Sequence, residues 1–192
     1  MTLSGEIGSQ ETRFINFARQ GDTAAWEPLV RHYQTPVFRL AYLILGDSSE
    51  VEDVTQEVFI RAFLSLTQYD AERPFRPWLM SIAANLARNR RRSIGRYWAA
   101  LRRYWQTEKI TDSINSESES EARRLWQAVR QLRPAAQEIV YLRYFLALSE
   151  GETAAALNIA PGTAKSRLHR ALKQLRAVIE VDFPDLREMW YE

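Results

Sequence analysis

Apolar residues recur along most of this chain at the spacing of an α-helix. The helical period runs from Glu11 to about Arg92 and resumes from about Glu121 to Leu186. Neither stretch shows a convincing alternation of apolar and polar residues with hairpin turns, which is the pattern of β-strands. The sequence therefore predicts an all-α protein made of two helical units.

Short breaks divide the first unit into separate helices. Gly21-Asp22 combines a helix stop with a capping acid, and Gly46–Ser49 repeats this combination. A further break is expected at "YDAERPFRP" (Tyr69–Pro77), because its two prolines disfavour helix.

A polar segment separates the two units. "TEKITDSINSESESE" (107–121) holds mainly Ser, Asn, Thr and Glu and hardly an apolar residue, which is typical of a flexible tether. We therefore expect two small helical domains, at 1–95 and 122–192, joined by a linker at 96–121.

The first part of this linker is rich in aromatic residues. Four rings alternate with arginines there: Tyr97, Trp98, Tyr104 and Trp105. We favour packing of these rings on the first domain as a short helix, since aromatic side chains are usually buried. The alternative is contact with nucleic acid or with a partner protein.

Positive charge is concentrated near the C-terminal end of the chain. The net charge is only +2, yet residues 161–176 hold five Lys or Arg and no acid. On a helix that includes Ala164, one face is apolar and is formed by Leu168, Ala171, Leu172 and Leu175. The opposite face is polar. One-sided charge of this kind is typical of a nucleic-acid contact, whereas solvated faces usually mix both signs.

The residues before the basic helix predict a second helix and a tight turn. Ser149 and Glu152 have the spacing of a capping box, Asn158 tolerates a left-handed turn, and Pro161 suits a first helical turn. Together they predict a helix-turn-helix, although an ordinary helical hairpin remains the alternative.

A helix-turn-helix presents its second helix to the major groove of DNA. Arg170 and Lys173 are candidates for guanine edges, while Lys165, Ser166 and Arg167 are candidates for phosphates. The sequence leaves this division open. The complete candidate set is Thr163, Lys165, Ser166, Arg167, His169, Arg170 and Lys173.

The segment 132–176, and above all "GTAKSRLHRALKQLR", resembles the −35-binding domain of extracytoplasmic-function sigma factors of the sigma-70 family. One departure is Ala160, which stands where the family usually caps the recognition helix with Ser. The missing cap corresponds to about 1 kcal/mol of stability.

The helix around Asp53 has two unlike faces. Val51, Val54, Val58 and Ala62 fall on one side, and the other side mixes polar with apolar residues: Asp53, Gln56, Glu57, Ile60 and Leu64. A polar face that also exposes Ile and Leu favours a partner protein over solvent. The enclosing segment 36–66 resembles the core-polymerase-binding segment of the same family, with its D-x-x-Q-E signature at Asp53, Gln56 and Glu57.

The segment 69–92 resembles the family's −10 element. Its expected buried stripe is Trp78, Leu79, Ile82, Ala83 and Leu86. An Asn/Arg stripe beside an aromatic loop is typical of single-stranded DNA binding. The candidate residues are Tyr69, Asp70, Arg73, Trp78, Ser81, Asn85, Arg88, Asn89 and Arg92. A solvated basic helix end accounts for Arg90–Arg92 alone, but it leaves Asn85 unexplained.

The resemblance covers about Phe14 to Arg176. It implies an initiation factor with a sigma region 2 domain and a sigma region 4 domain, which binds core RNA polymerase, duplex −35 DNA and single-stranded −10 DNA. It also implies an anti-sigma factor as a further partner. A stand-alone helix-turn-helix regulator is the alternative function.

Other functional classes find little support in the sequence. The chain has no cysteine and two histidines, His32 and His169, without metal-ligand spacing. We therefore expect no metal, no cofactor, no small-molecule substrate and no catalysis. The N-terminal residues show no signal peptide and the longest apolar run is too short for a bilayer, so a cytoplasmic location without membrane insertion is expected.

Overall fold

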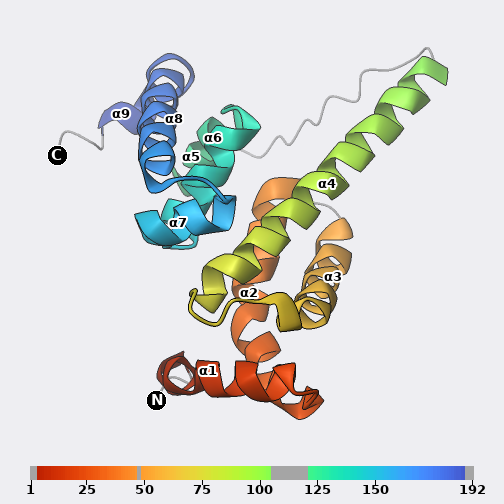
Figure 1. Cartoon of the computed structure of the whole chain (residues 1–192). Coiled ribbons are helices and arrows are strands. Elements are labelled where there is room, and N and C mark those ends of the chain that lie inside the picture. The colour runs from red at the N-terminus through yellow and green to blue at the C-terminus, as the bar shows by residue number, and fades with distance from the viewer. Residues whose placement is uncertain (1–3, 47–48, 105–120, 189–192) are drawn as a thin grey trace.

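The computed structural model describes residues 4–46, 49–104 and 121–188. Every regular element in these ranges is a helix, which confirms the all-α prediction. Two groups of helices lie side by side (Figure 1). Most of the expected tether lies outside the described residues.

The first group is a bundle of three long helices crossed by a fourth. Its elements are α1 (Ser4–Arg19), η1 (Thr23–Ala25), α2 (Trp26–Leu45), α3 (Glu50–Leu64), η2 (Leu66–Gln68) and α4 (Phe75–Tyr104). Helices α2, α3 and α4 pack on one another, and α1 packs on α2. Val37, Leu40, Val58 and Leu79 are fully buried between them.

The expected helix stop at Gly21-Asp22 is confirmed. Gly21 has a φ of +96°, and the Asp22 carboxylate accepts a 2.9 Å hydrogen bond from the Ala24 amide. The expected break at Tyr69–Pro77 is partly wrong, because α4 already begins at Phe75 and Pro77 lies in its first turn. Proline is tolerated there because a first-turn amide has no intrahelical acceptor.

Helix α4 continues past Gly95 as far as Tyr104, so residues expected to begin the linker extend this helix instead. The side chain of Tyr97 is 64% exposed. Most of this ring's surface therefore lies in solvent rather than against the first domain. The side chains of Trp98, Tyr104 and Trp105 lie outside the described residues.

Within the described residues, the second group contains six helical elements, of which α8 is the longest. These are α5 (Glu121–Arg130), α6 (Pro134–Val140), the π-helical turn η3 (Tyr141–Phe145), α7 (Glu150–Leu157), α8 (Pro161–Asp182) and α9 (Asp185–Glu188). The rings of Trp126, Tyr141 and Phe145 lie 5.5 to 5.8 Å apart and form an aromatic cluster beside α8. Gln137 is buried and donates to two carbonyls at the end of α5, those of Arg130 and Leu132.

The predicted helix-turn-helix is present in α7 and α8. Ser149 and Glu152 form both hydrogen bonds of a capping box, and Asn158 ends α7 with a φ of +53°. Pro161 occupies the first turn of α8. Ala160 is the N-cap residue of α8, and no side-chain bond caps this end of the helix.

Replacing Ala160 by Ser is expected to raise the free energy of unfolding of the C-terminal group by about 1 kcal/mol. The backbone of Ala160 already has the extended conformation of an N-cap (φ −64°, ψ 145°), so a hydroxyl there can accept from the first-turn amides. Thermal melting provides the measurement. Ala177→Ser, an exposed position inside the same helix, is the control and should lower stability slightly. Equal effects of the two variants would contradict a missing cap.

Helix α4 is buried on two sides. The expected stripe is largely confirmed, because Leu79, Ala83 and Leu86 are buried, whereas Trp78 and Ile82 are half-buried. Met80, Ala84 and Ala87 are also buried, with exposed fractions of at most 1%. Helix α7 packs against α4 as well as against α8, and it lies beside the first half of α4 (Figure 1). The two groups therefore share one continuous core.

Candidate nucleic-acid and protein interfaces

Helix α3 presents the two faces that its sequence predicts. Val51, Val54, Val58 and Ala62 are buried against the bundle. On the opposite side Asp53 and Gln56 are exposed, and Ile60 and Leu64 are 59% and 73% exposed. Two large aliphatic side chains thus lie in solvent on the same face as the Asp53 carboxylate, about two and three helical turns from it. This arrangement can bind a partner surface that offers apolar contacts and a positive charge.

Glu57 differs from the rest of this face because it is tied to its own fold. Its carboxylate accepts from Arg61 Nε at 2.9 Å and lies 3.9 Å from Arg90 of α4. Arg90 also forms a 2.7 Å ion pair with Glu50. These contacts link α3 to α4, so Glu57 helps to fix the orientation of the exposed face.

An open hollow of about 520 Å³ lies between α3 and α4. The lining residues are Arg61, Leu64, Ser65, Ile82, Asn85, Leu86 and Asn89. Two candidate residues of the −10 set, Asn85 and Asn89, therefore lie beside Leu64 of the α3 face. The hollow combines amide groups with apolar walls, a combination that suits an unpaired base.

The loop before α4 is shaped by Tyr69. This ring is buried, and it packs 4.8 Å from Trp78 and 5.5 Å from Phe75 between ring centroids. Its hydroxyl donates to the carbonyl of Arg73, and burial raises the pKa of Tyr69 to about 12. Tyr69 was predicted as a DNA contact because it begins the loop that resembles the family's −10 element. In this structure it instead holds the loop in place, and Trp78 is half-buried against it.

The rest of this loop is exposed. Asp70 and Arg73 form a 3.2 Å ion pair, and the Asp70 carboxylate also accepts from the amide of Glu72 at 3.1 Å. A basic and an acidic side chain are thus both available at the rim of the loop.

The polar stripe of α4 is only partly free to meet DNA. Asn85, Asn89 and Arg92 are exposed, whereas half-buried Ser81 donates to the carbonyl of Trp78. Arg88 donates to the side-chain oxygen of Asn85, and its Nη1 lies 3.3 Å from the carboxylate of Glu138 on α6. Only part of the predicted stripe is therefore exposed, and Arg88 is paired with Glu138 of the second group of helices.

Glu138 was not predicted as a functional residue. It is buried, and burial raises its pKa, while nearby arginines of α4 and α8 oppose this increase. The sequence gives little sign of this burial, because Glu138 is a single acid that follows Gln137 in an otherwise apolar stretch.

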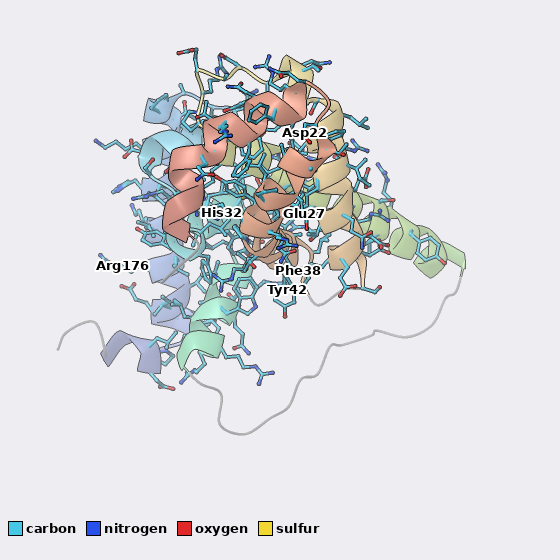
Figure 2. The ribbon with its side chains drawn as sticks, turned by 90° about the horizontal axis from the view of Figure 1, so that it is seen from below. Asp22, Glu27, His32, Phe38, Tyr42 and Arg176 are labelled. Atoms are coloured by element: carbon cyan, nitrogen blue, oxygen red, sulfur yellow. The ribbon has the colours of Figure 1, made fainter. Side chains whose placement is uncertain are left out.

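Helix α8 exposes most of its predicted polar face. Thr163, Lys165, Ser166, His169, Arg170 and Lys173 are all exposed, and Arg167 is half-buried. Arg170 Nε donates to the carbonyl of Ser166 at 3.2 Å, which directs its guanidinium along the helix. Arg176 lies on the outer side of α8 (Figure 2). This basic surface fits the width of a major groove.

The apolar face of α8 departs from the prediction at Leu172. Ala164, Ala171 and Leu175 are buried, but Leu172 remains 36% exposed. It faces a largely apolar groove of about 1040 Å³, whose wall includes Tyr144 and Phe145 of η3. The helical period predicts the side on which Leu172 lies, but it cannot predict that neighbouring helices leave this part of the side uncovered.

The sequence predicts no membrane-spanning helix and no metal site, and both expectations can be compared with the described residues. No helix within them is both long and apolar enough to cross a membrane. The same residues contain no cluster of acidic or histidine side chains that could hold a metal ion.

Comparison with known proteins identifies both groups of helices. The family model for sigma-70 region 2 matches residues 29–97, and that for sigma-70 region 4 matches residues 122–175. ECF RNA polymerase sigma factor SigW of Bacillus subtilis is 32% identical over 175 residues, which span 84% of this chain and 92% of SigW.

Solved structures show the same fold. CnrH in complex with the cytosolic domain of CnrY gives a TM-score of 0.67 at 24% identity, over 89% of this chain and 97% of CnrH. The sigma factor RpoE from Bartonella quintana, in complex with the anti-sigma factor NepR, gives 0.63 at 20% identity, over 81% and 97%. These similarities support a sigma factor and not a stand-alone helix-turn-helix regulator. The chain belongs to the extracytoplasmic-function group of the sigma-70 family, whose members are transcription initiation factors.

Proposed function

We propose that this sigma factor binds core RNA polymerase through the exposed face of α3. The observation that carries this assignment is the pair of exposed aliphatic residues, Ile60 and Leu64, on the same face as Asp53 and Gln56. Apolar side chains of this size are rarely left in solvent as a cluster unless a partner covers them. Glu57 orients the face through its contacts with Arg61 and Arg90.

We further propose that the loop 70–73 and the hollow between α3 and α4 receive an unpaired base of the −10 element. Asn85 and Asn89 offer hydrogen bonds to a base edge, while Ile82 and Leu86 supply apolar walls. Arg88 and Arg92 hold the phosphates of the strand, Trp78 packs on the ring of Tyr69, and Ser81 donates to the carbonyl of Trp78. Tyr69 acts as a positioning residue because its hydroxyl fixes the loop.

Asn85→Ala is expected to impair promoter opening more than initial promoter docking. Its amide is exposed beside the hollow, so it can contact a base only after the base has left the duplex. Reconstituted holoenzyme would be assayed on a closed promoter and on a pre-melted one, at matched occupancy. Gln34→Ala, an exposed amide on α2, is the control.

A pre-melted template should restore most of the activity of Asn85→Ala and leave the control unchanged. Equal defects on both templates would contradict a role in opening.

In the second domain, we propose that α8 binds the −35 element in the major groove. Arg170 and Lys173 are assigned to base edges, and Lys165, Ser166 and Arg167 are assigned to phosphates, with Thr163 and His169 at the edge of the contact. The support is the exposure of this face together with the confirmed helix-turn-helix geometry.

We also propose that an anti-sigma factor controls this protein, that it acts in the cytoplasm, and that it has no catalytic activity of its own. The fold matches that of sigma factors solved in complex with CnrY and with NepR. The apolar groove beside Leu172 and Phe145 offers a surface to a helical segment of such a protein.

A further inference from the structure

Glu138 occupies an unusual position between the two domains. It is 6% exposed, and its carboxylate lies 3.3 Å from Arg88 Nη1 of α4. The charges of Arg91 and Arg92 on α4, and of Arg167 on α8, also act on it and lower its pKa, against a larger opposing effect of burial. The Glu138 carboxylate is thus in contact with Arg88 of the first domain and within the electrostatic influence of Arg167 of the second.

Three of these arginines are assigned above to promoter DNA: Arg88 and Arg92 to the −10 strand and Arg167 to the −35 element. We propose that Glu138 takes the place of a DNA phosphate among these arginines, and that it holds the free protein in a closed conformation that competes with promoter DNA. This inference rests on the proposed DNA contacts.

The remaining contacts between the domains are consistent with a specific docked state. Arg76 Nη2 donates to the carbonyl of Leu146 at 2.6 Å, across 70 residues of sequence. Arg76, Met80, Ala84 and Arg88 recur every four residues, so they share one face of α4. Its first and last members contact the second domain, and Met80 and Ala84 between them are buried. The second domain therefore covers this face of the −10 helix.

The closed conformation is too small to engage a promoter. The −35 and −10 elements lie about 25 base pairs apart, or roughly 85 Å at the rise of B-DNA. A compact chain of this length has a radius of gyration of about 16 Å, and even the 30-residue helix α4 is only about 45 Å long, so the closed conformation falls well short of this span. Both elements can be contacted only after the domains separate, and separation breaks the pair between Arg88 and Glu138.

The closed state can be tested through the distance between the domains. The chain has no native cysteine, so spin labels can be placed on Gln20→Cys and Gln174→Cys, both at exposed positions. Three variants are then compared with this background: Arg88→Glu, Glu138→Arg and the double exchange of the two charges. Each single variant places like charges in contact, and the double variant restores an opposite pair.

We expect a short, narrow distance distribution for the parent, a longer and broader one for each single variant, and a return toward the parent for the double variant. Recovery in the double variant also shows that both domains remain folded. A broad distribution for the parent, single variants that match the parent, or a double variant that stays open would each overturn the proposal.

Competition with DNA is tested with the free protein and a short fluorescent oligothymidine. Glu138→Arg should bind it about 10-fold more tightly than the parent, because the binding-competent state becomes dominant. Glu180→Arg makes the same charge change at an exposed position of α8 and is the control. An equal gain in both variants would overturn the competition.

A separate experiment tests whether Arg88 contacts DNA at all. Arg88→Gln in the holoenzyme, assayed on a pre-melted promoter, tests the DNA contact without reference to the closed state. An unchanged activity there would remove the role of Arg88 in DNA binding, and the distance measurements would still decide whether the Arg88–Glu138 contact closes the free protein.

Discussion

Replacing Ile60 and Leu64 together by Asp is expected to lower the affinity for core RNA polymerase by at least about 100-fold. A residue that forms the centre of an interface contributes about 2 kcal/mol or more, and the two substitutions also place new carboxylates in the contact. Both side chains are largely exposed in the free protein, so stability should change by less than about 0.5 kcal/mol per site. Affinity for core enzyme and thermal melting would be measured on the same preparations.

Val181→Asp is the matched control for this experiment. Val181 is 77% exposed, but it lies near the end of α8, outside the proposed interface. It should leave core binding unchanged. If the double variant unfolds, and binding falls only in proportion to the folded fraction, the α3 face is structural and the interface is wrongly assigned.

Arg170→Ala is expected to relax the preference of the holoenzyme at one position of the −35 element. A bidentate contact from Arg to a base contributes about 1–3 kcal/mol of discrimination, so the preferred base should lose roughly 5- to 150-fold of its advantage. The measurement is selection of active promoters from a library in which the −35 element is randomised. Promoters that differ only at that position should then become nearly equal in activity.

Lys165→Ala should behave differently because its expected partner is a phosphate. Activity should fall on every promoter alike, and the slope of log affinity against log salt should decrease by about one. Gln174→Ala, an exposed neutral residue on the same helix, controls for the loss of side-chain volume. A uniform loss in both Arg170→Ala and Lys165→Ala would show that α8 contacts the backbone alone.

Features that depend on local pattern could be predicted from the sequence. Valines and an alanine at helical spacing locate the buried side of α3, and their positions place Asp53, Ile60 and Leu64 on the other side. The capping box and the left-handed turn at Asn158 could also be predicted, because caps and turns depend on a few neighbouring residues. In these places local preference and tertiary packing agree.

Features that depend on distant segments could not be predicted in this way. The second buried face of α4 is formed largely by alanines, which occur in both buried and exposed helix faces and so carry little pattern. Burial of Glu138 results from a contact across 50 residues, and an isolated acid gives no local sign of it. Tyr69 was assigned to DNA by the resemblance of its loop to the family's −10 element, and only its packing against Phe75 and Trp78 shows that the ring is internal.

The position of Glu138 beyond the end of α4 has a consequence for newly made protein. The ribosome completes α4 at Tyr104 before it adds Glu138, so the N-terminal helices emerge first. At roughly 5–20 residues per second, the arginines of α4 have no intramolecular carboxylate from α6 for a few seconds. During that interval the nascent chain should have its greatest attraction to polyanions. If Glu138 closes the free protein as proposed, each newly made chain should be open at first and should close only after α6 has been synthesised.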